Sequence, residues 1–191
     1  ADDCNIYVKS PKAAQRVFKS VCTWIEKHLK IPVNLDKSAW GEPWERQFLG
    51  YRHTRAGDLE PSPKAMEKYK ETVREIFNNR NSLSEEGVKC KWKLYVQGWC
   101  TYFSLAKEAW WRRKLSAWTR RHIRKWYWQR WHSAQGRRNN LRKLGESEHN
   151  LNRCPLWGSA WRMSRHPVMN VALSNKVLTR IGFLTPIDFA M

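Results

Sequence analysis

The stretch Tyr95-Val96-Gln97-Gly98-Trp99-Cys100-Thr101-Tyr102-Phe103 decides the fold of this 191-residue chain. It lies in a segment with helical spacing that we predict to begin at the capping-box pattern Ser82-Leu83-Ser84-Glu85 and to end near Leu105. Gly98 permits a second helix to approach closely. The side chains predicted to face inward are Val88, Trp92, Tyr95, Val96, Trp99 and Phe103. Trp99 and its neighbours Tyr102 and Phe103 are therefore expected in a core rather than at a ligand.

Helical patterns flank this segment on both sides. Ser62-Pro63 is an N-cap followed by a first-turn proline and predicts a helix that ends near Asn79. A third helix is predicted over about 107–133, with Arg113, Arg120 and Arg124 on a stripe separate from its apolar face. Past Gly145 the pattern weakens until a last helix, predicted from about 164 to 181.

The first 62 residues have mixed character. They predict a strand over 4–9, a helix over 11–29 after Ser10-Pro11, and a strand over 31–35. A further short strand is expected over 47–51, and Gly57 and Pro61 mark 54–61 as a linker. Together with the helices that follow, this pattern predicts the α+β class.

Positive charge is concentrated in the C-terminal part. The chain carries 36 Lys and Arg against 17 Asp and Glu, and residues 106–191 hold +14 of the net +19. Such a field favours a polyanion, with nucleic acid first and an anionic membrane surface second. Many of the thirteen tryptophans lie beside Arg or Lys, a pattern that suits stacking on bases as well as packing between helices.

Other classes of protein are disfavoured. The five cysteines form no CxxC pair and have no matching histidine spacing, which argues against a zinc site or a disulfide framework. No apolar run approaches the roughly 18 residues of a membrane span, and no secretory signal is recognisable at the start. We expect a reducing compartment and no membrane partner.

Several motifs, in this order, give the chain a resemblance. Ala1-Asp2-Asp3 resembles the end of the Tyr-Ala-Asp-Asp motif of reverse transcriptases, Val33-Asn34-Leu35-Asp36-Lys37-Ser38 resembles their Val-Asn-x-x-Lys-Ser segment, and Phe48-Leu49-Gly50-Tyr51 resembles their primer-grip segment. Residues 98–103 resemble the Gly-Trp-x-x-Tyr-Phe signature of group II intron maturases, and residues 138–145 and 161–165 resemble later segments of the same proteins. The chain is thus similar to the C-terminal half of a group II intron reverse transcriptase/maturase.

The resemblance implies an organisation in three parts. Residues 1–62 would be the C-terminal part of a reverse-transcriptase palm, residues 63–105 helices of the thumb, and residues 106–191 a maturase-specific RNA-binding region, the X domain. The fold expected is therefore a partial palm remnant followed by a mostly α-helical thumb and maturase domain.

It also implies catalytic residues. Asp2 and Asp3 would be catalytic metal ligands for Mg²⁺ in a two-metal site that this fragment leaves incomplete, since a third Asp of the family lies upstream. The plain alternative for the two aspartates is an Asx-type turn before a strand. Lys37 would stabilise charge near the leaving pyrophosphate, the alternative being a surface lysine. Polymerase activity is expected of the full-length parent and not of this fragment alone.

Two binding surfaces follow from the same resemblance. The primer grip would comprise Phe48, Leu49, Gly50 and Tyr51, which are also suited to an ordinary strand. The residues expected to bind RNA are Arg112, Arg113, Arg120, Arg121, Arg124, Lys125, Arg137, Arg138, Arg142 and Lys143. Their density in one helix and the next is unfavourable without a counter-anion, which phosphates would supply. The alternative is a solvated cationic surface.

Three functions are compatible with parts of the sequence. The first is part of an RNA-directed DNA polymerase that also binds intron RNA to promote splicing and mobility, with template RNA, DNA primer and dNTP as partners of the parent. The second is a non-catalytic splicing cofactor that binds structured intron RNA. The third, a basic helical DNA-binding protein, ranks last because it leaves Ala1-Asp2-Asp3 and Phe48-Leu49-Gly50 unexplained. The expected location is the cytoplasm, in a bacterium near the nucleoid, or an organelle; no oligomeric state is predicted.

Overall fold

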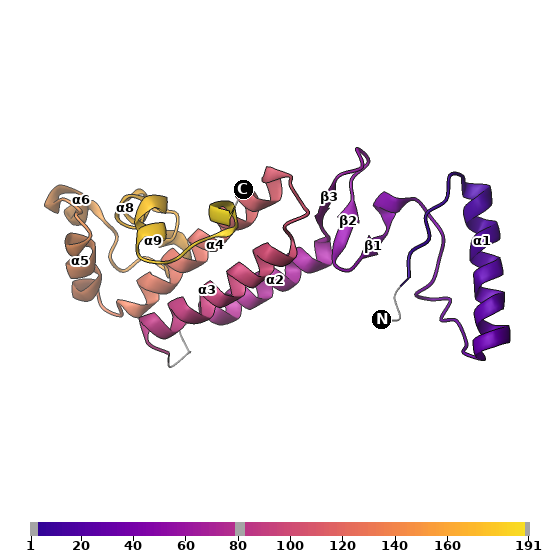
Figure 1. Ribbon diagram of the computed structural model, residues 1–191. Helices are drawn as coiled ribbons and strands as arrows, with labels where there is room; N and C mark the ends of the chain where they lie inside the picture. Colours follow the sequence, from indigo (N-terminus) through magenta and orange to yellow (C-terminus); the bar gives the residue numbers. More distant parts are fainter. Residues whose placement is uncertain (1–3, 79–82, 190–191) are drawn as a thin grey trace.

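A computed structural model describes residues 4–78 and 83–189. Figure 1 shows an elongated chain with α1 at one end, a small sheet next to it, and a helical body that reaches α5 and α6 at the other end. The helices and strands, in order, are α1 Pro11–Trp24, η1 Ile25–Leu29, η2 Pro43–Glu45, β1 Gln47–Phe48, β2 Tyr51–His53, β3 Leu59–Pro61, α2 Pro63–Ile76, α3 Glu85–Tyr102, α4 Ala109–Arg130, α5 Ala134–Lys143, α6 Glu148–Arg153, α7 Ala160–Met163, α8 Pro167–Ala172, α9 Asn175–Arg180 and η3 Pro186–Phe189. The predicted α+β class is confirmed.

Serine caps define where most of the longer helices begin. Ser10, Ser62 and Ser133 each accept a hydrogen bond from the backbone N–H three residues later, at 3.3, 3.2 and 3.0 Å. A serine at this position satisfies a backbone donor that has no partner within its own helix. The predicted starts at Pro11 and Pro63 are thereby confirmed. In α3 the cap is Ser84, whose hydroxyl accepts from Gly87 at 3.1 Å, and Ser82 of the predicted capping box lies outside the described residues.

The core lies in the helical body. Helix α2 packs on α3 and α4, and α4 also contacts α7 and η3. Four tryptophans in the core are fully buried: Trp92, Trp111, Trp126 and Trp128. Aromatic rings connect the helices, with centroid separations of 4.8 Å for Tyr69 and Trp99 and 5.4 Å for Trp99 and Trp111. These tryptophans therefore fill helix interfaces.

The C-terminal segment comprises residues 144–189, after α5. Hydrogen bonds from buried indoles attach it to this core. The Trp92 indole N–H donates to the Leu184 carbonyl at 2.7 Å, and the Trp128 indole donates to the Gly158 carbonyl at 2.9 Å. The last predicted helix is interrupted: α8 ends at Ala172 and α9 begins at Asn175. The break coincides with Ser174, whose hydroxyl caps α9 by accepting from the Val177 N–H at 3.4 Å.

The N-terminal strands predicted over 4–9 and 31–35 are wrong. Residues 4–8 are extended and exposed, and residues 35–37 form a turn. A strand needs a partner for its backbone groups, and the described sheet is built instead from 47–61, with order β1-β2-β3 and antiparallel pairing. The predicted linker over 54–61 accordingly contains β3, and the single strand predicted over 47–51 is a hairpin.

Helix α1 stands apart from the core (Figure 1). It matches the predicted helix over 11–29, which ends in the π turn η1. All of its residues are described and none of them is buried. Its apolar face is therefore only partly covered within this chain, and the assignment of residues 1–62 to a palm stays a prediction.

We predict that Trp92→Phe lowers the free energy of unfolding by about 2 kcal/mol, because the Leu184 carbonyl loses its buried donor and a small void remains. Urea unfolding followed by circular dichroism measures the change. The matched control is Trp157→Phe, at a side chain that is 82% exposed, where we expect less than about 0.5 kcal/mol. Equal losses in the two variants would contradict the role given to the Trp92 hydrogen bond.

Candidate nucleic-acid interface

The hairpin predicted as a primer grip has an unusual turn. Phe48 pairs with Tyr51, so Leu49 and Gly50 form a two-residue connection with φ of +49° and +76°. Positive φ at both positions is the requirement of a type I′ turn, which glycine meets without strain and leucine does not. Leu49 is also 54% exposed. The turn therefore combines a strained backbone with an apolar residue that is accessible to solvent.

The maturase-like signature at the end of α3 holds this turn in place. The Tyr102 hydroxyl donates to the Leu49 carbonyl at 2.8 Å, and the Tyr51 hydroxyl donates to the Tyr102 carbonyl. Phe103 is buried, with its ring centroid 5.0 Å from that of Tyr51, and a Cβ added at Gly50 would lie 3.4 Å from its ring. Two motifs that are about fifty residues apart in the sequence therefore form one contact.

The remaining residues predicted to be catalytic are not brought to this hairpin in the described part of the chain. The Asn34 side chain accepts from the backbone N–H groups of Asp36 and Lys37 at 3.1 and 3.2 Å, which shapes the turn on which an exposed Lys37 sits. Asp2 and Asp3 lie outside the described residues. Within 4–78 and 83–189, no group of three or more His, Cys, Asp or Glu side chains is placed to hold a metal ion.

Three of the predicted RNA-binding arginines stack on tryptophans. The guanidinium carbons of Arg112, Arg121 and Arg137 lie 4.4, 3.6 and 4.7 Å from the ring centroids of Trp111, Trp161 and Trp128. Arg137 also donates to the Leu156 carbonyl at 2.7 Å, and burial lowers its pKa. Stacking and hydrogen bonding of this kind fix a guanidinium in one orientation, so these side chains support the fold.

Two more arginines, on α5, are paired with an acid. Arg138 and Arg142 bind the two carboxylate oxygens of Glu148 at 2.7 and 2.5 Å. The hydrogen bond from Arg142, followed by that from Arg138, lowers the pKa of Glu148 to about 2. This exposed cluster joins α5 to α6 and still carries a net positive charge.

The other predicted cations differ in their surroundings. Arg113 and Lys143 are exposed and Lys125 is half-buried. Arg120 and Arg124 face α8, α9 and η3, and Arg124 donates to the Leu173 carbonyl at 3.0 Å. The predicted arginine stripe is therefore divided, because the C-terminal segment covers Arg120 and Arg124 and leaves Arg113 in solvent.

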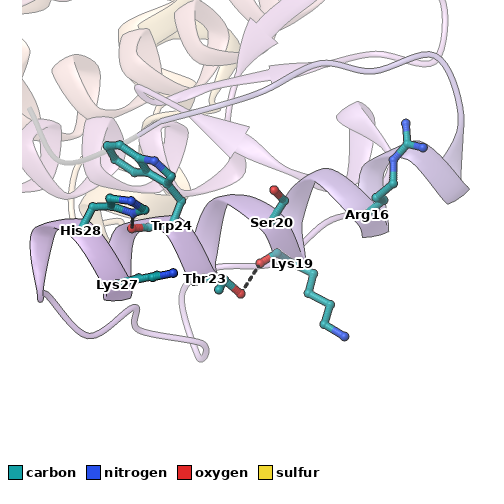
Figure 2. Close-up of a pocket in the computed structure, with 7 residues that line it drawn as sticks. All are labelled: Arg16, Lys19, Ser20, Thr23, Trp24, Lys27 and His28. Atoms are coloured by element: carbon teal, nitrogen blue, oxygen red, sulfur yellow. Dashed lines mark hydrogen bonds between the residues drawn. The ribbon is translucent and has the colours of Figure 1, made fainter.

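Figure 2 shows a second cationic surface that the sequence pattern did not reveal. A shallow groove of about 470 Å³ on α1 and η1 is lined by Arg16, Lys19, Ser20, Thr23, Trp24, Lys27 and His28. The Trp24 and His28 rings are stacked with centroids 4.9 Å apart, and His28 Nδ1 donates to the Trp24 carbonyl at 3.1 Å. The small net charge of residues 1–62 gives no hint of this cationic face, because the acids that balance its charge lie mostly outside the helix. The helical spacing of the cations is the sequence signal that could have predicted the face.

His122 on α4 lies in a cationic and aromatic environment. Its ring is 4.0 Å from the Trp118 centroid and 5.3 Å from that of Trp161. Burial, followed by the charges of Lys125, Arg74 and Arg121, lowers the pKa of His122 to about 4. The imidazole is therefore neutral at physiological pH and does not contribute to phosphate binding there.

Comparison with known proteins identifies the helical part of the chain. A family model described as "Group II intron, maturase-specific domain" matches residues 66–145, which include α3, α4 and α5. The search of curated proteins found no match. No helix in the described ranges has both the length and the apolar character needed to cross a membrane. The resemblance drawn from residues 98–103 and 138–145 is confirmed.

We predict that Leu49→Asn raises the free energy of unfolding by about 1 kcal/mol, because asparagine tolerates the left-handed backbone that leucine resists. Urea unfolding measures it. Leu94→Asn, at a 70% exposed position in α3, is the matched control and should lose a few tenths of a kcal/mol through helix propensity. The turn is not strained if both variants lose stability alike.

A second prediction concerns the stability of the fold at acidic pH. The unfolded state protonates His122 near its ordinary pKa of 6.5 and the native state near 4, so stability is complete above pH 6.5 and falls as pH drops toward 4. The loss should be about 2 kcal/mol, allowing for partial solvation of the ring. Chemical unfolding at a series of pH values should show a shallower slope for His122→Gln than for wild type, and His132→Gln, at an exposed histidine, should match wild type. Parallel profiles for wild type and His122→Gln would disprove the linkage.

Proposed function

We propose that this chain, whose residues 66–145 are a group II intron maturase-specific domain, binds structured intron RNA through the exposed cations of α4 and α5 and thereby promotes splicing. The domain itself implies a role in RNA binding and intron splicing. The observation that supports this choice of RNA-binding surface is its charge. Residues 106–145 contain thirteen Lys and Arg and one acid, Glu108.

The surroundings of the cations favour some of them as RNA contacts over others. The guanidinium groups of Arg112, Arg121 and Arg137 stack on tryptophan rings, so we expect their positive charge to contribute mainly to the long-range field. Exposed Arg113 and Lys143 have the freedom to pair directly with phosphates. A surface of this kind contacts the RNA backbone and recognises shape rather than base sequence.

We expect the double variant Arg113→Ala/Lys143→Ala to bind a group II intron transcript about tenfold more weakly at 0.1 M salt. Removal of two phosphate contacts should also reduce the slope of log K against log salt by about 1.5. Filter binding over a sodium chloride series measures both.

Lys64→Ala/Lys68→Ala, at exposed positions on α2, removes the same charge and serves as the control. Equal weakening by the two double variants would show that net charge alone governs binding. Duplex DNA of similar length tests the DNA-binding alternative, which would gain support if it bound as tightly as the transcript.

A specific observation favours a second role. The exposed, strained Leu49 on a turn that Tyr102 holds is suited to a contact with a primer strand, since strained backbone is often retained at functional sites. In this proposal Phe48, Leu49, Gly50 and Tyr51 form the primer grip of an RNA-directed DNA polymerase, and Asp2, Asp3 and Lys37 serve its chemistry with Mg²⁺. Primer extension on an RNA template, by a protein containing this chain, measures the activity.

A further inference from the structure

A polar groove lies between α4 and the two short helices α8 and α9. It has a volume of about 440 Å³ and is lined by Ala117, Arg120, Arg124, Asn170, Ser174 and Asn175. None of these six described residues is acidic, and two are arginines from successive turns of one helix face. The groove exists because the C-terminal segment folds back over α4.

Both guanidinium groups are held in fixed positions. Arg124 donates through Nε to the Leu173 carbonyl at 3.0 Å and through a terminal nitrogen to Asn175 Oδ1 at 3.2 Å. Arg120 has a side chain that is only 12% exposed, and it lies 3.6 Å from the carboxylate of Asp188. The buried Arg120 Nε has no hydrogen-bond partner within the described structure. These groups are positioned before any ligand binds.

The charge of the groove is not balanced. The groove holds two guanidinium groups, and the carboxylate of Asp188 pairs with one of them, Arg120; it also accepts from the Thr185 backbone N–H at 2.7 Å and hydroxyl at 2.8 Å. Burial, followed by repulsion from the charge of Arg120, lowers the pKa of Arg124. One further negative charge would neutralise the site.

The remaining polar groups are suited to an oxyanion. Ser174 uses its oxygen to accept from the Val177 N–H at 3.4 Å, so its own O–H is a donor. The Asn175 oxygen is taken by Arg124, which leaves the amide NH₂ of that side chain as the other available donor. Arginine pairs match the geometry of phosphate oxygens.

We propose that this groove binds one phosphodiester group of the RNA backbone and so fixes the position of the RNA on the maturase domain. The inference rests on the proposed function. A phosphodiester carries the single negative charge that the groove lacks. Exposed Arg113 lies on the same face of α4, seven residues or about 10 Å before Arg120, where it can meet a neighbouring phosphate of the same strand, which favours a polyanion over free phosphate.

Asn175→Asp tests the groove with little risk to folding. The new carboxylate keeps an acceptor for Arg124 and neutralises the site. The matched control is Gln97→Glu, which adds the same negative charge at an exposed position on α3, outside the cations assigned to RNA binding. We expect Asn175→Asp to bind a group II intron transcript at least about tenfold more weakly than Gln97→Glu, with a salt slope smaller by about 1.

A second variant covers the case in which Asn175→Asp unfolds the chain. Ala117→Glu places a carboxylate at an exposed position on the floor of the groove and should weaken RNA binding to a similar degree. Thermal unfolding by circular dichroism confirms that the variants are folded. Equal affinities of Asn175→Asp, Ala117→Glu and Gln97→Glu would overturn the proposal.

The source of the phosphate is tested separately with inorganic phosphate in thermal unfolding. A groove specific for RNA backbone predicts little protection by millimolar inorganic phosphate and a clear difference between the variants in RNA binding. Protection of wild type by inorganic phosphate, lost in Asn175→Asp while RNA affinity is unchanged, would overturn it in favour of a free anion. If wild type shows no salt-dependent RNA binding at all, the proposed function itself fails.

Discussion

Buried indole N–H groups are the constraint on which the helical body depends. A tryptophan placed in a core brings a large apolar surface and one donor that is costly to leave without a partner. The buried Trp111 Nε1 has no partner within the described residues, whereas Trp92 and Trp128 donate their indole N–H to the carbonyls of Leu184 and Gly158, both in the C-terminal segment. The segment after α5 is thereby drawn onto α3 and α4. These two bonds add to the apolar packing that also holds the short helices α7, α8 and α9 in place, through buried side chains that include Met163, Met169 and Leu178.

The packing of the C-terminal segment on α4 also determines which partners the arginines of α4 have. A run of cations on one helix repels itself in isolation. In the folded chain, Arg121 is placed over Trp161, Arg124 against the Leu173 carbonyl, and Arg120 near Asp188. The covering segment thus supplies partners for these three arginines. In the proposed function, the cations that stay exposed, rather than the whole of the basic sequence, contact the RNA.

The contact between the hairpin and α3 links the N-terminal part to the maturase domain. Across it the Tyr102 hydroxyl donates to the Leu49 carbonyl, the Tyr51 hydroxyl donates to the Tyr102 carbonyl, and Phe103 covers Gly50. The strained Leu49 turn is thus held by the end of a long, well-packed helix. If both proposed contacts exist, α3 connects the RNA-binding surface to the turn proposed as a primer grip.

The sequence by itself determined the four long helices α1 to α4, most of their serine caps, the excess of positive charge and the maturase signature, because these depend on neighbours within a few residues. The tertiary structure alone decided the strands, since residues 4–8 and 31–35 have strand-like composition but no strand partner among the described residues, whereas 47–61 pairs with itself. It also decided which cations are exposed: Arg113 and Arg120 are equivalent in a helical pattern, and only the packing of η3 and α9 separates them. The groove on α4 could not be predicted for the same reason, because its polar groups come from segments about fifty residues apart that only the folded chain brings together.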